Sequence, residues 1–210
     1  MRCSLKKKQL KSYQYAKQIW RFSSLKNGNT QWCESLLERD YLLSLEYDDD
    51  VIRYLSQPAS IVYEDLNGKP KRYTPDTLLR TKSGDSLSEV KPSKFITLEL
   101  EDKVRHINRH LCQNNSPEIN IVTDDNIRIG DRMKNLYFLY NYRQINIDQC
   151  YNSVLMTQIR DGIKYEDLLK LTDRMEEQQV ISIAMIAHGI LTFDQSKLIT
   201  SHTFLEFNYD

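Results

Sequence analysis

Hydrophobic and polar positions follow two different rhythms along the first half of the chain. Residues 33–46 carry apolar side chains at intervals of three and four, with acids on the opposite face, which predicts an amphipathic helix. Short β-rich runs separated by turn signals follow between residues 51 and 92. Asn67-Gly68 and Ser83-Gly84-Asp85 mark two of the turns, so an antiparallel meander is predicted, with strands at 60–66, 71–80 and 86–91.

The helical rhythm returns over residues 97–113, and the apolar run INIVT at 119–123 predicts a short buried strand after it. The order helix, three strands, helix, strand is typical of a mixed β-sheet flanked by helices, so the predicted fold class is α/β. An aromatic-rich helix, MKNLYFLYNYRQI, closes this domain.

The remainder of the chain reads differently, as helices at 151–159, 165–177 and 179–188. Gly189 stops the last helix before two short β-like runs, an order that is similar to a small winged-helix-like domain. We therefore predict three parts: a basic N-terminal segment (1–30), an α/β domain (31–147) and a mostly helical winged-helix-like domain (148–210).

Composition narrows the class of protein. The chain has 210 residues, 40% hydrophobic and 28% charged, which is typical of a soluble globular protein. No apolar run approaches the length of a membrane span, and the N-terminal sequence lacks the apolar core of a secretory signal. The four cysteines are scattered without a CxxC pair, so we expect reduced thiols and a cytoplasmic location.

The formal net charge of zero hides a strong asymmetry. Residues 1–33 hold eight Lys and Arg and no acid, and aromatic residues are interleaved with these cations. Such a segment suits a DNA backbone, although a solvated basic tail is the alternative. The candidate DNA contacts are Lys6, Lys7, Lys8, Lys11, Lys17 and Arg21, with Lys94 as a further one next to the third predicted strand.

Residues 151–210 have the opposite balance, five Lys and Arg against nine Asp and Glu. A net charge of −4 repels phosphate, so a protein partner suits this end of the chain better than DNA does.

The stretch RYTPDTLLRTKSGDSLSEVKP, residues 72–92, carries the candidate chemistry. If its turn centres on Lys82 and Ser83, Asp76 lies across from Glu89, and Lys91 shares a strand face with Glu89. Two carboxylates at that distance repel each other unless a cation lies between them. Mg²⁺ binds through one or two carboxylates and phosphate oxygens, so the sequence predicts a Mg²⁺ site in which Mn²⁺ can substitute.

Plainer interpretations stand beside this one. Asp76, Glu89 and Lys91 could instead form an exposed ion-paired network on the hairpin. Glu34 and Glu46 are interpreted as solvated acids of the helix. His106 and His110 have metal-ligand spacing, but no third ligand accompanies them. The acidic run at 122–126 reads as a capping turn after a strand.

Pro75-Asp76, followed after twelve residues by Glu89-Val90-Lys91, resembles the PD-(D/E)xK signature of restriction-endonuclease-like nucleases. The resemblance extends to one family, the TnsA endonucleases of heteromeric transposases. It is carried by SLLERDYLLSLEYDDDVIRYLSQPASIVY, YTPDTLLR, SEVKPSK and INIVTDDNIR. The resemblance implies that the helix acid is Glu38, that Glu38, Asp76 and Glu89 hold the metal, and that Lys91 is the catalytic lysine.

This resemblance also implies a role and partners. A TnsA subunit hydrolyses the 5′ transposon ends, a TnsB-like transposase cuts and joins the 3′ ends, and a TnsC-like AAA+ regulator contacts the C-terminal domain. A bacterial cytoplasmic protein that acts on transposon-end DNA is therefore expected. The alternatives are a stand-alone nuclease of restriction or repair type and a DNA-binding relative without catalysis.

Overall fold

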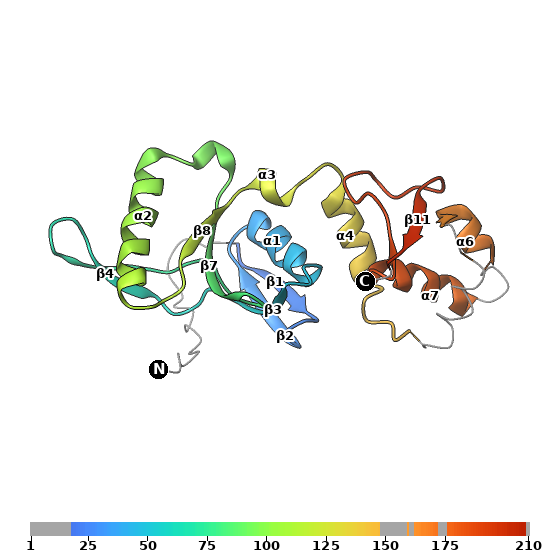
Figure 1. Ribbon diagram of the computed structural model, residues 1–210, viewed down its shortest axis with the longest axis horizontal. Coiled ribbons are helices and arrows are strands. Elements are labelled where there is room, and N and C mark those ends of the chain that lie inside the picture. Colours follow the sequence, from blue (N-terminus) through green and yellow to red (C-terminus); the bar gives the residue numbers. More distant parts are fainter. Residues whose placement is uncertain (1–17, 148–158, 160–161, 172–175, 209–210) are drawn as a thin grey trace. The chain divides into compact units, whose positions relative to one another are not determined.

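The computed structural model describes residues 18–147, 159, 162–171 and 176–208 (Figure 1). The chain divides into two compact units, Met1–Ile127 and Arg128–Asp210. The division falls before the predicted boundary at 147, because helix α4 (Arg132–Tyr140) packs against α7 (Glu176–Ala187) and so joins the second unit.

The first unit is built around a four-stranded mixed sheet in the order β3-β6-β7-β8. Strands β3 (Val51–Ser56), β6 (Thr77–Thr81) and β7 (Gly84–Val90) run antiparallel, and β8 (Ile119–Val122) runs parallel to β7. The parallel pair needs a crossover, which is helix α2 (Leu98–Gln113), preceded by the short 3-10 helix η1 (Ser93–Phe95). Helix α3 (Asp124–Ile127) ends the unit.

Helices cover both faces of this sheet. Leu87 of β7 lies in one apolar cluster with Val104, Ile107 and Leu111 of α2. The next residue, Ser88, points to the opposite face, where its hydroxyl lies 2.8 Å from the hydroxyl of Tyr41 in helix α1 (Leu36–Glu46). The predicted α/β fold, a mixed sheet flanked by helices, is confirmed.

Helix α1 begins three residues later than the predicted start at 33. Ser35 is extended (φ −144°, ψ 160°), and its hydroxyl accepts a hydrogen bond from the backbone of Glu38, which makes it the N-cap. Cys33 is still part of strand β2 (Asn29–Cys33), so the helix cannot start before the cap.

The predicted three-strand meander is wrong in two respects. The strand predicted at 71–80 is broken at Pro75, which has no N–H to donate. Its halves become β5 (Pro70–Tyr73), which pairs with β4 (Ile61–Glu64) in a separate two-stranded sheet, and β6 of the central sheet. The true neighbour of β6 is β3, a strand that the sequence pattern did not predict.

A second unpredicted feature is the hairpin of β1 (Trp20–Ser24) and β2. It occupies residues that were predicted to belong to the basic N-terminal segment and to the start of the first helix. Two of its amide side chains cover the outer edge of β3. The Asn27 oxygen accepts the backbone N–H of Tyr54 at 3.2 Å, and the Gln31 oxygen accepts that of Ser56 at 2.9 Å. Side chains thus satisfy an edge that would otherwise be open to another strand.

Glu46, predicted to be a solvated acid, is buried and ties this hairpin to the sheet. Its carboxylate accepts hydrogen bonds from the Ser24 hydroxyl (2.6 Å), from the Lys26 backbone (3.0 Å) and from the Tyr54 hydroxyl. A buried carboxylate is tolerated here because neutral donors satisfy it.

The second unit combines helices with a small antiparallel sheet in the order β10-β11-β9. The elements after α4 are β9 (Ile163–Lys164), α6 (Tyr165–Leu171), α7, β10 (Leu191–Thr192) and β11 (Phe204–Phe207). Helices predicted at 165–177 and 179–188 correspond to α6 and α7, whereas the helix predicted at 151–159 lies outside the described segments. Gly189 follows α7 with a positive φ of 76°, as a helix-stopping glycine should.

The winged-helix-like assignment of this unit stays a prediction. No helix within the described ranges has both the length and the apolar character that crossing a bilayer requires.

Replacing Glu46 with alanine should lower the free energy of unfolding of the first unit by about 3 kcal/mol, because three donors lose their acceptor. Ser24→Ala removes one donor and should cost about 1 kcal/mol. Both tryptophans, Trp20 and Trp32, lie in the β1–β2 hairpin, so urea unfolding followed by tryptophan fluorescence measures this unit. Equal losses in the two variants would contradict the role of the carboxylate.

Candidate active site

The β6–β7 hairpin sets the register of the candidate site. Thr81 pairs with Gly84, so the turn consists of Lys82 and Ser83, as predicted. Gly84 has φ +141°, a conformation that glycine adopts without strain. The pairing continues to Thr77 opposite Ser88, where the ladder ends, and Asp76 follows directly beyond it, close enough for the charge of Glu89 to act on it.

Backbone hydrogen bonds fix Asp76 on two sides. Its N–H donates to the carbonyl of Ser88 in β7 at 2.9 Å, and its carbonyl accepts the N–H of Gln57, just beyond β3, at 2.8 Å. Its carboxylate oxygen Oδ2 accepts the backbone N–H of Val90 at 2.8 Å. The side chain therefore lies against the strand that carries Glu89 and Lys91.

Asp76 lies in an environment that opposes its negative charge. Burial, and then the charges of Glu89 and Glu38, raise the pKa of Asp76 to about 7. The Val90 N–H and Lys91 act in the other direction and do not compensate. A carboxyl group held half-protonated near neutral pH by its neighbours is a typical feature of a site that accepts a cation.

Lys91 contacts Glu89 directly. Its Nζ lies 2.9 Å from Oε1 of Glu89, whose side chain is only 8% exposed, while that of Lys91 is 39% exposed. Burial lowers the pKa of Lys91, but the hydrogen bond and charge of Glu89, with Asp76 next, outweigh it and hold this pKa above its usual value. Lys91 is therefore a charged donor beside two acids.

Glu38 is close enough to act on this charge cluster, but its carboxylate caps its own helix. Oε1 accepts the Ser35 hydroxyl and Oε2 accepts the Glu34 backbone N–H, each at 2.8 Å, so the carboxylate is bonded to the N-cap residue and to the residue before it. Within the described ranges, no group of three or more Asp, Glu, His or Cys side chains is placed to hold a metal ion. The structure thus brings Asp76, Glu89 and Lys91 together, and the ligand role of Glu38 stays a prediction.

The donor set suits a hard divalent cation in its chemistry. Asp76 and Glu89 offer carboxylate oxygens, and Mg²⁺ needs only one or two carboxylates when substrate phosphate and water complete its shell. Tyr73, which the sequence reasoning missed, adds a buried hydroxyl that interacts with Glu89 but makes no hydrogen bond of standard geometry within the described part of the chain. Burial, and then Glu89, raise the pKa of Tyr73, so this hydroxyl keeps its proton and can donate.

Two of the predicted DNA contacts pack against aromatic rings. Arg21 lies over the Trp32 ring, at 5.0 Å from its centroid, and Lys94 lies over the Phe95 ring at the same distance. Lys6, Lys7, Lys8, Lys11 and Lys17 fall outside the described residues. His106 donates from Nε2 to the carbonyl of Glu64 at 2.6 Å, which agrees with a structural role rather than a metal ligand.

A mixed sheet flanked by helices, with an Asp-Glu-Lys cluster at a strand end, is the arrangement of restriction-endonuclease-like proteins. Residues 48–124 match the family model described as TnsA-like endonuclease N terminal. This match confirms the resemblance drawn from the motifs: the first unit carries a TnsA-type endonuclease domain of that superfamily. The matched segment contains Asp76, Glu89 and Lys91 but not Glu38. A search of curated proteins found no match to the chain.

The raised pKa of Asp76 predicts a pH-dependent stability in the absence of metal. Because this pKa of about 7 lies above the unfolded value, ionising Asp76 destabilises the fold as pH rises from about 4 to about 7. Asp76→Asn should therefore be the more stable protein above pH 7, by up to about 4 kcal/mol, with the difference vanishing near pH 4. Thermal unfolding in a chelator at pH 4, 6 and 8 measures this, and a pH-independent difference would contradict it.

Proposed function

We propose that this protein is a metal-dependent DNA endonuclease of a cut-and-paste transposon that hydrolyses the phosphodiester bond at the 5′ transposon ends. The observation that carries the proposal is the family match over the β6–β7 hairpin. At the end of this hairpin Asp76 lies within reach of the charge of Glu89, and Lys91 is paired with Glu89.

In this proposal Asp76 and Glu89 hold Mg²⁺, or Mn²⁺ in its place. The bound ion supplies Lewis-acid polarisation of the scissile phosphate and an acidified water. The backbone bonds at Asp76 keep its carboxylate in place before any ligand arrives. Glu89 is buried and Asp76 is partly buried, so charge interactions in the site are stronger than at the surface.

Lys91 is the proposed catalytic lysine. Its ammonium group is charged and its side chain is 39% exposed, so Lys91 can leave Glu89 for a substrate phosphate oxygen or a water. Once a cation neutralises Glu89, that exchange costs little, and Lys91 stabilises negative charge that develops on the phosphate. Glu38 adds negative charge to the same region, and as a third ligand it would have to release its helix cap.

The TnsA-like domain also underlies the proposed context. A TnsB-like transposase would cut and join the 3′ ends, and a TnsC-like AAA+ regulator would bind the second unit. Residues 151–210 carry nine acids against five bases, a balance that favours a protein partner there. A stand-alone restriction or repair nuclease is the second candidate, since the matched domain alone does not specify partners.

Asp76→Ala and Lys91→Ala should each lower cleavage of transposon-end DNA at least about 100-fold, because one removes a metal ligand and the other a charged donor. Cleavage is followed on a sequencing gel with Mg²⁺ and the partner proteins present. Asp102→Ala, which removes an exposed acid of α2, is the matched control and should cut normally. Normal cutting by Asp76→Ala would refute the assignment of the site.

Labelling each DNA strand separately tests the division of labour. With Asp76→Ala, 5′-end nicks should vanish while 3′ cutting and joining by the partner transposase continue. Efficient cutting of both strands by the wild-type protein alone would instead favour the stand-alone nuclease. Wild-type cutting that persists in a chelator would rule out a metal-dependent reaction.

A further inference from the structure

The β4–β5 hairpin forms a ribbon, residues 61–73, that stands apart from the central sheet. Among the described residues, β4 and β5 pair with each other and with no other strand. Figure 1 shows the ribbon running past α2, with its turn beyond the helix. Leu66 at the turn is 86% exposed and Val62 of β4 is 55% exposed, so the ribbon is not buried in a core of its own.

Both ends of the ribbon's segment are tied to the candidate active site. Ser56 pairs with Thr77 in the β3–β6 ladder, and the next residue, Gln57, donates its N–H to the carbonyl of Asp76. The chain therefore leaves the sheet beside Asp76, forms the ribbon, and returns to Asp76 three residues after Tyr73. A substrate whose scissile bond lies at Asp76 has the root of the ribbon next to it.

Helix α2 holds the ribbon's base in a defined position. Tyr63 and Tyr73 belong to the apolar cluster with α2. His106 of α2 donates to the Glu64 carbonyl and packs edge-on against Tyr63, with ring centroids 5.9 Å apart. The ammonium of Lys103 lies 4.9 Å from the centre of the Tyr73 ring. The ribbon is thus a pre-organised arm, and binding through it would cost little ordering entropy.

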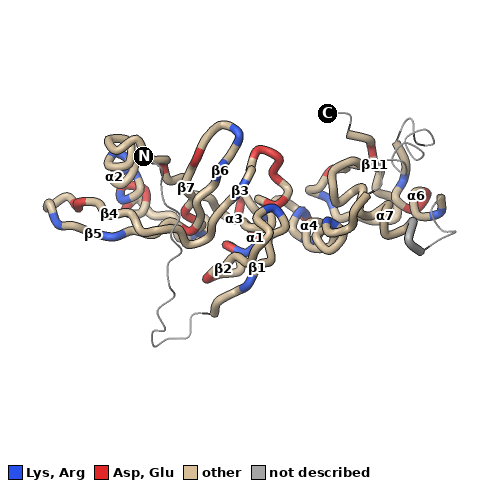
Figure 2. The backbone as a smooth tube through the Cα atoms, turned by 90° about the horizontal axis from the view of Figure 1, so that it is seen from below, with Lys and Arg blue, Asp and Glu red and all other residues tan. Residues whose placement is uncertain are grey.

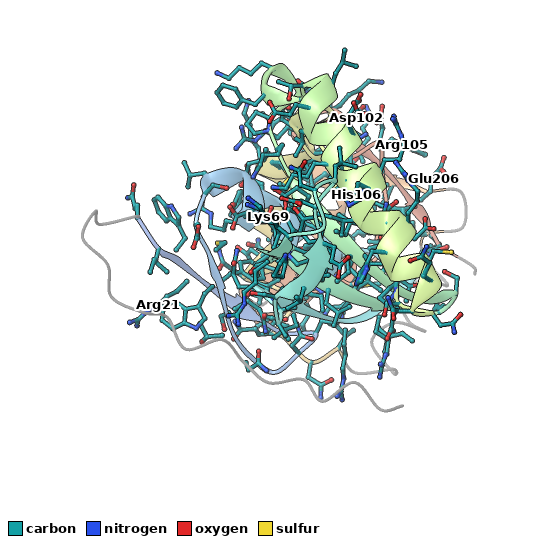
Figure 3. All side chains as sticks on the ribbon, turned by 90° about the vertical axis from the view of Figure 1, so that its left-hand side faces the viewer. Arg21, Lys69, Asp102, Arg105, His106 and Glu206 are labelled. Carbon is teal, nitrogen blue, oxygen red and sulfur yellow. The ribbon has the colours of Figure 1, made fainter. Side chains whose placement is uncertain are left out.

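Positive charge dominates the returning strand of the ribbon. Lys69, Lys71 and Arg72 are all exposed, and Figure 2 shows Lys and Arg positions in blue at the tip of the ribbon and along β5. The ribbon also carries two acids. Asp65 accepts the N–H groups of Asn67 and Lys69 at 2.9 Å each and lies 3.9 Å from the ammonium of Lys71. Glu64 is exposed, and Lys69 and Arg72 are left as the ribbon's cations without an ion pair to any residue that the structure describes. Figure 3 labels Lys69, on the ribbon, and His106, on α2.

We infer that the ribbon is a DNA-binding arm that contacts the phosphate backbone of the duplex beside the cleaved bond, through Lys69 and Arg72. This inference rests on the proposed function. A two-stranded β-ribbon fits the major groove of B-DNA, and each lysine or arginine that neutralises a phosphate adds to affinity by releasing counterions. Asn67 is nine residues from Asp76, so at about 3.3 Å per residue the tip reaches up to about 30 Å from the site.

The test is the salt dependence of DNA binding by the full chain. Fluorescence anisotropy with a labelled transposon-end duplex, in chelator so that nothing is cut, gives Kd over a range of salt concentrations. Lys69→Ala/Arg72→Ala should weaken binding about 10-fold near 0.15 M salt and lower the slope of log K against log salt by about 2. Lys170→Ala/Lys197→Ala, two exposed cations of the second unit with the same charge change, is the control and should match wild type.

Two further measurements separate the arm from the catalytic site. The melting temperature and the Mn²⁺ affinity of Lys69→Ala/Arg72→Ala, by calorimetry, should equal those of wild type, because the variant leaves the ribbon's packing and the carboxylates intact. Wild-type affinity and slope in this variant, or the same loss in the control, would overturn the arm while leaving the nuclease proposal standing. A wild-type protein that neither binds nor cleaves DNA would overturn the proposed function, and the arm with it.

Discussion

The first unit depends on the way in which Asp76 is bonded into the backbone. One residue joins β3 and β7 through its own peptide groups, accepting from Gln57 and donating to Ser88, and its carboxylate accepts from Val90. The same three bonds hold β3, β6 and β7 in register, fix the base of the β4–β5 ribbon, and hold the carboxylate against the strand that carries Glu89 and Lys91. The register of β6 therefore determines both the fold of the sheet and the position of the acids, because a shift of this strand by one residue would turn its side chains to the opposite face.

That arrangement has an electrostatic cost. Asp76 is partly buried beside Glu89 and near Glu38, and its pKa of about 7 expresses how strongly these surroundings oppose its charge. Glu46, on the other face of the sheet, shows the contrast: it is more deeply buried, yet three neutral donors satisfy it. A buried acid with enough donors holds the fold together, whereas a group of acids with one lysine is suited to receive a cation.

In the proposed nuclease, the ribbon and the Asp76 cluster would serve DNA binding and catalysis from two parts of one segment. Residues 58–75 leave the sheet and return to it beside Asp76, so a few residues of backbone link the proposed DNA-binding surface to the proposed catalytic site. Packing of Tyr63 and Tyr73 on α2 makes that link stiff. The second unit, with its own small sheet, is left for a partner protein in the proposed complex.

Local patterns determined much of this protein. The 3.6-residue period predicted α1 and α2, the turn signal located the β6–β7 turn at Lys82-Ser83, and the motifs identified the TnsA-like family. Features that depend on contacts between residues distant in sequence were decided only by the tertiary structure. The tertiary structure pairs β6 with β3, ends the predicted strand at Pro75 and buries Glu46. It also bonds the Glu38 carboxylate to the N-terminal end of its own helix and buries the Tyr73 hydroxyl near Glu89. Periodicity reports a residue's own backbone, whereas the partner of a strand edge or a carboxylate is set by which distant segment packs there.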